Sequence, residues 1–353
     1  MKLYEIGIII TGNTPSKKIK EYYESNDIMF IKPGDIEEKY ITNLKKSEDY
    51  ISEKARNKVR ILPKGTVLVT SIGTIGKVGI LENEATCNQQ INAIIPIDMI
   101  ISKYLAYLIK SKQKKLQLKA NAPVVPIINK TDFSKIEINI CDREEQKKIV
   151  KKLDLTKKII DIRKKQIEEL NIIIKSQFVE MFENKNYPKI KGKDLFVFSS
   201  GKFLESHKRL KEGIPVYGGN GIVWYTDKEL IDYNTIVIGR VGAYCGNVKL
   251  VRELAWITDN AIYIKQFKKD VYNIDFLFNM MEAINFFKFA QKSGQPKITQ
   301  KPLEEYNYIV PPIDEQLNFS NIVKQIDKQK FEIEKSLKEA QELYESLMEK
   351  YFG

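Results

Sequence analysis

Residues 143–182 read REEQKKIVKKLDLTKKIIDIRKKQIEELNIIIKSQFVEMF and contain neither glycine nor proline, the two residues that interrupt helices most strongly. Their apolar residues recur about every 3.5 positions, which is typical of a helix that packs along a coiled-coil seam. At about 1.5 Å per residue, residues 146–182 would form a helix roughly 55 Å long. The expected seam residues are Ile149, Leu153, Ile160, Ile167, Leu170, Ile174 and Met181.

A second segment, towards the end of the sequence, repeats this pattern. Its stripe consists of Ile322, Ile326, Ile333, Ala340, Leu343 and Leu347. Such a stripe fits either an amphipathic helix on a core or a coiled-coil seam, and its length favours the seam. Two similar stripes in one chain can pair with each other. An antiparallel pair would hold one globular part at each end.

The segments that precede the two helices also resemble each other, at an offset near 170 residues. This spacing is too long for a solenoid repeat and indicates duplicated domains. The matches, in order, join residues 66–69 and 71–78 to 235–238 and 240–248, 89–90 to 259–260, 126–129 to 296–299, and 142–146 to 312–316.

Each copy begins with short β-branched runs separated by Gly, Pro and Asn, with a few helices such as 102–115 and 274–289. We therefore predict an α+β fold, in which two similar mixed α/β domains are separated by two long antiparallel coiled-coil helices with a pseudo-two-fold internal repeat. The predicted parts are residues 1–142 and 186–312 for the domains, and 143–185 and 313–353 for the helices.

The 353-residue sequence has a formal net charge of +12. Lysine-rich composition alone can explain such a charge, and the other reading is a polyanionic partner, most often nucleic acid. The sequence contains no uncharged run of about 18 apolar residues, which is the length needed to span a membrane. Glu5 and Gly7 lie where a signal peptide would need its apolar stretch, so we expect a cytoplasmic protein without a membrane partner.

Residues that commonly carry catalysis or bind metals are sparse. Cys87, Cys141 and Cys245 lie far apart, which argues against disulfides and against a cysteine-ligated metal. His207 is the only histidine and lies in a polar stretch, as expected of a surface residue. We therefore expect neither a catalytic residue nor a metal site.

The glycine-containing loop at residues 73–79 follows a predicted strand and superficially resembles a phosphate-binding loop. A Walker loop would need Gly where Ser71 stands and Ser or Thr where Val78 stands. A dinucleotide or methyl-donor site would need a helix next, but residues 80–95 read as turn and strand. We predict a tight turn here, and by the same argument at residues 239–242. Residues 121–124 lack the first proline and the aromatic of an amino-methyltransferase motif.

Polar loops with glycine occur in both copies, at residues 12–17, 32–35 and 217–221. Small residues let backbone N–H groups approach phosphates, while Asn, Gln, Lys and Arg can read base edges. Each loop could equally be an ordinary turn with solvated side chains. The candidate DNA-contacting residues are Thr14, Ser16, Lys17, Lys32, Ser71, Lys77, Gln89, Gln90, Tyr217, Asn220, Arg240, Tyr244, Asn247 and Lys297.

The sequence resembles the specificity subunits of Type I restriction-modification systems over essentially its whole length. The motifs that carry this resemblance are residues 14–16, 72–73 and 144–146 in the first half, and residues 213–221, 235–242, 256–261 and 311–316 in the second. One departure is Cys141-Asp142-Arg143, where the family usually has two prolines. It leaves open how the first long helix begins.

The resemblance implies that each domain reads one half of a split, asymmetric site in double-stranded DNA, and that the helices fix the gap. It also implies two methyltransferase subunits docked on the helices, and restriction subunits joined to them. S-adenosylmethionine, ATP and Mg would then belong to those partners, and this chain would hold no cofactor. Two alternatives are a diverged DNA methyltransferase and a coiled-coil adaptor without DNA specificity.

Overall fold

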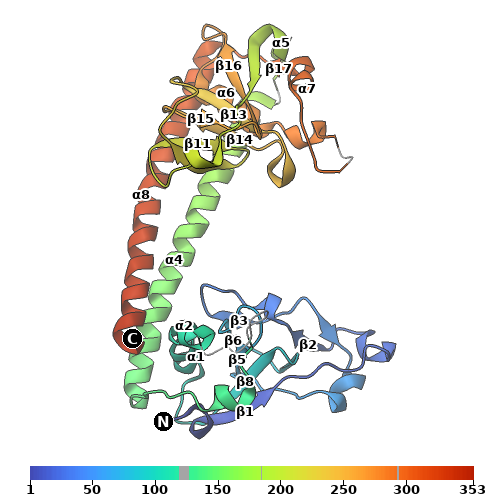
Figure 1. Ribbon diagram of the computed structural model, residues 1–353, viewed down its shortest axis with the longest axis vertical. Helices are drawn as coiled ribbons and strands as arrows, with labels where there is room; N and C mark the ends of the chain where they lie inside the picture. The colour runs from blue at the N-terminus through green and yellow to red at the C-terminus, as the bar shows by residue number, and fades with distance from the viewer. Residues whose placement is uncertain (119–126, 184, 292–293) are drawn as a thin grey trace. The chain divides into compact units, whose positions relative to one another are not determined.

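The computed structural model describes residues 1–118, 127–183, 185–291 and 294–353, and it divides into two compact units. Unit 1 contains Met1–Ile162 and Ser336–Gly353, and unit 2 contains Arg163–Lys335. Each unit consists of one globular domain and a part of each long helix (Figure 1). Residues 121–124, which lack the first proline and the aromatic of an amino-methyltransferase motif, lie outside the described residues.

The domain of unit 1 contains a five-stranded sheet in the order β1-β8-β5-β6-β3 and a three-stranded sheet in the order β4-β2-β7. Its strands are β1 (Gly7–Thr11), β2 (Ile28–Ile31), β3 (Thr42–Leu44), β4 (Tyr50–Ile51), β5 (Val67–Thr70), β6 (Val78–Leu81), β7 (Ala85–Cys87) and β8 (Ile91–Pro96). Its helices are η1 (Leu3–Glu5), η2 (Lys20–Tyr23), η3 (Pro33–Asp35), η4 (Glu53–Lys58), α1 (Ser102–Ser111), α2 (Gln113–Leu118) and α3 (Lys130–Ser134).

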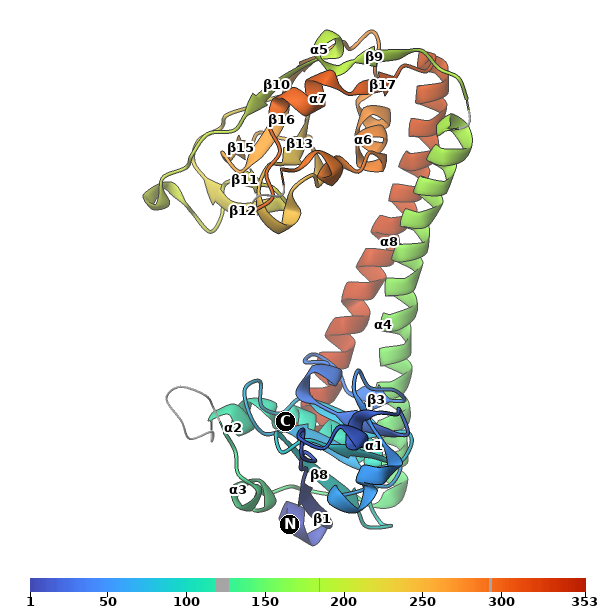
Figure 2. The same cartoon turned by 90° about the vertical axis from the view of Figure 1, so that its right-hand side faces the viewer.

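The domain of unit 2 contains sheets in the orders β10-β16-β13-β14, β12-β11-β15 and β17-β9 (Figure 2). Its strands are β9 (Lys189–Lys191), β10 (Phe196–Ser200), β11 (Ile214–Gly218), β12 (Gly221–Thr226), β13 (Thr235–Gly239), β14 (Val248–Val251), β15 (Trp256–Ile257), β16 (Ala261–Phe267) and β17 (Asn307–Ile309). Its helices are η5 (Val179–Glu183, a π turn), α5 (Gly192–Leu195), η6 (Ser206–Lys208), η7 (Gly242–Tyr244), α6 (Ile274–Ala283), η8 (Phe286–Phe289) and α7 (Gln300–Glu305).

Corresponding strands form the centre of each domain. Every residue of β5 and of β13 is buried, as expected for β-branched runs covered on both faces. Each of these strands pairs antiparallel with the strand that follows it, β6 or β14. Both glycine loops are therefore turns between strands, as predicted.

Two long helices complete the chain. Helix α4 (Arg143–Phe178) has 36 residues and α8 (Ile313–Phe352) has 40, and Figures 1 and 2 show them side by side. In unit 1, Ile149 and Leu153 of α4 share a core with Ala340 and Tyr344 of α8. In unit 2, the residues that share a core are Ile174 and Phe178 of α4 with Phe319, Val323 and Ile326 of α8. The start of one helix thus meets the end of the other, so the pair is antiparallel, and the predicted fold class is confirmed.

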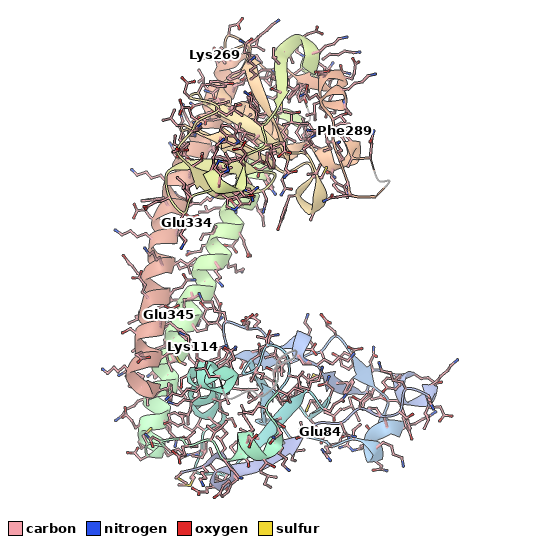
Figure 3. The ribbon with its side chains drawn as sticks, in the orientation of Figure 1. Glu84, Lys114, Lys269, Phe289, Glu334 and Glu345 are labelled. Carbon is pink, nitrogen blue, oxygen red and sulfur yellow. The ribbon has the colours of Figure 1, made fainter. Side chains whose placement is uncertain are left out.

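One predicted seam residue is wrong. Leu343 is 50% exposed, whereas Tyr344 is 7% exposed and lies in the core of unit 1. An alternation of four and three residues from Ala340 reaches Tyr344 and then Leu347, and Leu343 is one position off this stripe. Ile167 and Ile333 are half-buried. Many exposed positions of the two helices carry charged residues, and Figure 3 labels Glu334 and Glu345 among them.

A buried glutamine fixes the start of each long helix. Gln146 accepts a hydrogen bond from Ile101 N at 2.9 Å and donates to Cys141 O at 3.0 Å. Gln316 likewise accepts from Asn273 N at 3.0 Å and donates to Pro311 O at 2.9 Å. The repeated Glu-Gln motif is therefore structural.

The missing prolines before the first helix have a simple replacement. Helix α4 begins at Arg143, and the Asp142 carboxylate accepts a hydrogen bond from Glu145 N at 2.9 Å. A side-chain acceptor at this place satisfies one of the backbone N–H groups that a helix start leaves without a partner.

Among the described helices, none has the length and apolar character needed to cross a membrane.

Candidate nucleic-acid interface

The turn after β5 and the turn after β13 are held by the same main-chain bonds. Ser71 N donates to Gln90 O at 2.8 Å, and Arg240 N donates to Asn260 O at 2.9 Å. The carbonyl groups of the same two residues also accept equivalent hydrogen bonds: Ile128 N donates to Ser71 O, and Ile298 N donates to Arg240 O. Ser71 and Arg240 are thus equivalent positions on one backbone framework.

The loops after β1 and β10 join this framework. Gly12 N donates to Ile91 O, and Gly201 N donates to Ala261 O, both at 3.1 Å. A Cβ atom at Gly12 would lie 2.2 Å from Asn88 O, and one at Gly201 would lie 2.2 Å from Thr258 O. No side chain fits at either position, so glycine allows the two backbone segments to touch.

The loops after β2 and β11 complete each set. Asn88 N donates to Ile31 O at 3.1 Å, and Thr258 N donates to Tyr217 O at 2.9 Å. Each domain therefore brings together several loops. In unit 1 these are residues 12–17, 32–35, 71–77 and 88–90, and in unit 2 they are 201–202, 218–221, 240–247 and 258–260. The sequence pattern had marked all of them except the loop at 201–202.

In unit 1, several candidate side chains bind one another or the backbone. The Thr14 hydroxyl lies 2.7 Å from Gln89 Oε1, and Lys77 Nζ donates to Pro33 O at 2.8 Å. Lys32 forms a 2.5 Å ion pair with Asp49, which partly neutralises its charge. Ser16 and Lys17 are exposed, and Gln90 accepts a bond from Asn88.

Ser71 does not fit the prediction of a DNA contact. Ser71 is only 4% exposed, because the turn folds over it and Ile128 N donates a hydrogen bond to its carbonyl oxygen. A serine hydroxyl at that depth cannot reach a base edge. Its position remains informative as the equivalent of Arg240.

In unit 2, the polar candidates gather around the turn between β13 and β14. Asn247 Nδ2 donates to Asn220 Oδ1 at 2.9 Å, and Tyr244 is 52% exposed. Arg240 donates to Asp259 O at 3.4 Å, and none of the described carboxylates forms an ion pair with it. Lys297 is exposed, and its backbone bridges to Val241 beside this turn.

Tyr217 is less suited to a base contact than its neighbours. Its hydroxyl donates to Glu253 Oε1 at 2.8 Å. Burial, reinforced by the bond to Glu253, raises the pKa of Tyr217 to about 12. The proton of the hydroxyl group is therefore already engaged by Glu253.

Two glutamine side chains that support the turn after β5 were not predicted from the sequence. Gln113 Nε2 and Gln117 Nε2 donate to Ile75 O at 3.1 and 3.3 Å. Both glutamines lie on α2, more than 35 residues from the turn that they hold. No pattern in the sequence signals such a contact, because the pairing depends on where α2 packs.

The fold and these loops define a class of protein: two similar domains, each carrying a clustered polar loop surface, on a pair of antiparallel helices. Residues 1–171 and 184–343 match the family described as the Type I restriction modification DNA specificity domain. These matches cover most of the sequence, and the chain therefore belongs to that family.

Individual relatives are named as specificity subunits of Type I restriction enzymes. The chain is 37% identical over 187 residues to the Type I restriction enzyme MjaIX specificity subunit of Methanocaldococcus jannaschii, a match covering 52% of this chain and 42% of that protein. It is 26% identical to the Type I restriction enzyme EcoprrI specificity subunit of Escherichia coli, over 90% of this chain and 84% of that protein. The fold resembles the crystal structure of a Type-I restriction-modification system S subunit from M. genitalium, with a TM-score of 0.61, 19% identity, and coverage of 100% and 95%.

Proposed function

We propose that this chain is the DNA-specificity subunit of a Type I restriction-modification complex and reads a bipartite, asymmetric site in double-stranded DNA. One observation carries the proposal. The same main-chain framework occurs twice, with different side chains at equivalent positions, Ser71 against Arg240 and Lys77 against Asn247. Two copies of one scaffold with different polar side chains are suited to reading two different half-sites.

The helices would set the gap between the half-sites. Direct readout by one module covers only a few base pairs, so a long site needs two modules on a spacer. A continuous helix of 36 residues is about 54 Å long at about 1.5 Å per residue. The helix length would then be the property that determines how many unread base pairs separate the halves.

The first half of α4 also offers a surface for a partner protein. Leu155, Ile159 and Ile162 are 53%, 44% and 46% exposed, and their spacing places them on one side of the helix, away from its buried seam. Exposed apolar side chains in such a row favour a protein partner. We assign this surface to the methyltransferase subunits, two per complex, with the restriction subunits joined to them.

We further propose that the chain itself is not catalytic and holds no cofactor. S-adenosylmethionine, ATP and Mg would be bound by the partner subunits. The naming of the relatives as specificity subunits supports this division. A diverged methyltransferase would instead transfer methyl groups to DNA when purified alone with S-adenosylmethionine.

Selection from a randomised duplex library by the assembled complex tests the proposal. We expect two short specified sequences separated by an unspecified gap of constant length. Binding should also weaken steeply with salt, with a slope of log K against log salt near −7 for about eight neutralised phosphates. A selection without any preferred sequence would reject specific recognition, and methylation by the chain alone would reject the non-catalytic assignment.

A further inference from the structure

Two asparagines of unit 2 form a hydrogen-bonded pair across two loops. Asn220 lies between β11 and β12, and Asn247 lies at the end of the turn that leads into β14. Asn247 Nδ2 donates to Asn220 Oδ1 at 2.9 Å, and both residues are exposed. The pair therefore presents polar atoms to solvent while its geometry is fixed from within the domain.

The remaining hydrogen-bonding capacity of Asn247 is specific. A carboxamide nitrogen carries two protons, and one of them is used by Asn220. Asn247 Oδ1 accepts no hydrogen bond from the described side chains. One free proton beside one free acceptor matches the major-groove edge of adenine, where N7 accepts and the N6 amino group donates.

The backbone around the pair is held firmly. Asn247 O accepts from Gly239 N at 2.8 Å, and Asn247 N donates to Tyr244 O at 3.1 Å. The two loops touch, since a Cβ atom at Gly219 would lie 3.3 Å from the Gly239 Cα atom. A carboxamide fixed at both ends loses less freedom when it binds a base, which favours a directional contact.

Unit 1 has a different residue at the equivalent position. Lys77 O accepts from Thr70 N at 3.1 Å, as Asn247 O accepts from Gly239 N. The lysine ammonium only donates, and it is bound to Pro33 O at 2.8 Å. It cannot accept a hydrogen bond from the adenine N6 amino group, so the equivalent position in unit 1 lacks this feature.

We propose that Asn247 reads one adenine in the half-site bound by the second domain, and that Asn220 is a positioning residue that orients the Asn247 carboxamide. This inference rests on the proposed function, because it requires that the second domain contacts base edges in the major groove.

Base substitution by 7-deazaadenine tests the contact directly, since this analogue lacks the N7 acceptor and keeps the N6 amino group. The duplex is the one selected by the wild-type complex, with each adenine of the second half-site replaced in turn. We expect a loss of affinity of about tenfold at one position. For Asn247→Ala, the adenine preference at that position should be lost, and the analogue should bind as well as adenine.

Variants of the partner residue separate positioning from simple loss of structure. Asn220→Ala should reduce the discrimination between adenine and 7-deazaadenine, whereas Asn220→Asp keeps an acceptor oxygen and should restore it, even though its charge weakens overall affinity. The matched control is Asn234→Ala, because Asn234 is exposed and lies at the other end of β13. Its discrimination should equal that of the wild type.

The outcomes distinguish this inference from the proposed function. A selected second half-site without adenine, or one in which no adenine is sensitive to the analogue, overturns the role of Asn247 while bipartite recognition stands. Equal sensitivity in the wild type and in Asn247→Ala overturns it too. A wild-type complex that selects no sequence at all rejects the proposed function itself.

Discussion

The hydroxyl group of Tyr107 on α1 donates a hydrogen bond of 2.7 Å to Asp154 Oδ1 on α4. Lys103 forms an ion pair of 2.9 Å with the other oxygen of the same carboxylate. Asp154 thus ties the first domain to the long helix that follows it. Burial, together with the bond to Asp154, raises the pKa of Tyr107, so the phenol remains a donor throughout the physiological range.

Replacing Tyr107 by Phe should therefore destabilise unit 1. A hydrogen bond to a charged acceptor contributes about 1.5–3 kcal/mol, so we expect a loss in this range in urea denaturation. The matched variant in unit 2 is Tyr272→Phe, whose hydroxyl donates to the neutral Ile309 O at 2.7 Å. It should cost only about 0.5–1.5 kcal/mol. Equal effects of the two variants would show that Asp154 adds nothing beyond an ordinary acceptor.

The buried glutamine of unit 2 allows a more local test. Gln316→Leu leaves Asn273 N, Val271 O and Pro311 O without their partner, and each such group costs about 1–3 kcal/mol. Amide hydrogen exchange should become faster in unit 2 and stay unchanged in the domain of unit 1. Gln329→Leu on the exposed side of α8 serves as the control. Unchanged protection around Asn273 would contradict the structural role of the motif.

Helix length should determine the gap between half-sites. Residues 163–169 of α4 and 330–336 of α8 form one heptad each and contribute to neither domain core. Deleting both keeps the seam in register and shortens the pair by roughly 10 Å. That corresponds to about three base pairs at roughly 3.4 Å each. Methylome sequencing should show unchanged half-sites with a shorter gap, and altered half-sites with the original gap would show that the helices do not measure it.

Arg240 should act in one half-site only. Its side chain is bound by a single long contact to a carbonyl, and its equivalent in unit 1 is the buried Ser71. If the guanidinium contacts guanine, Arg240→Ala costs about 1–3 kcal/mol at one position of the second half-site. A phosphate contact would instead weaken all sequences alike and reduce the salt slope by about one. Relaxed selection in the first half-site would refute the assignment of Arg240 to the second.

Lys110 gives a prediction about pH. Burial lowers the pKa of Lys110 from 10.5 to about 8, while its ammonium donates to Gln113 Oε1 at 2.6 Å. Between about pH 8 and 10.5 the unfolded chain holds a proton at this residue that the folded chain has released, so the contribution of Lys110 to the free energy of unfolding rises with pH in this window. Lys110→Met should lack that rise. Parallel stability curves for the two proteins over this window would show that the lysine is not desolvated.

The sequence predicted the elements whose periodicity is strong. It did not predict which residues are buried where burial depends on contacts with distant parts of the chain. The 3.5-residue stripe located both helices, but a leucine at 343 looked more suitable for the seam than the tyrosine at 344. The structure prefers Tyr344 because its ring meets Tyr40 and Tyr107 edge-on, at centroid distances of 5.5 and 6.4 Å. Those partners come from distant parts of the chain, and periodicity carries no information about them.

The candidate loops show the same division. Glycines and polar residues marked segments that form loops and turns in the structure, since such residues favour turns. They did not reveal that Ser71 is buried or that Asn220 and Asn247 meet, because both facts depend on strand register. Lys32 was chosen for its charge, and its pairing with Asp49 could not be inferred from spacing.

The glycine contacts at Gly12 and Gly201 have a consequence for how such a protein changes over time. The framework common to the two domains consists of backbone hydrogen bonds and of backbone contacts at glycine, so folding constrains the exposed side chains on these loops only weakly. Substitutions at exposed loop positions such as 17 and 244 can accumulate with little cost to stability. A new target sequence can therefore arise through a few point mutations on one domain, while the other domain keeps its ancestral preference.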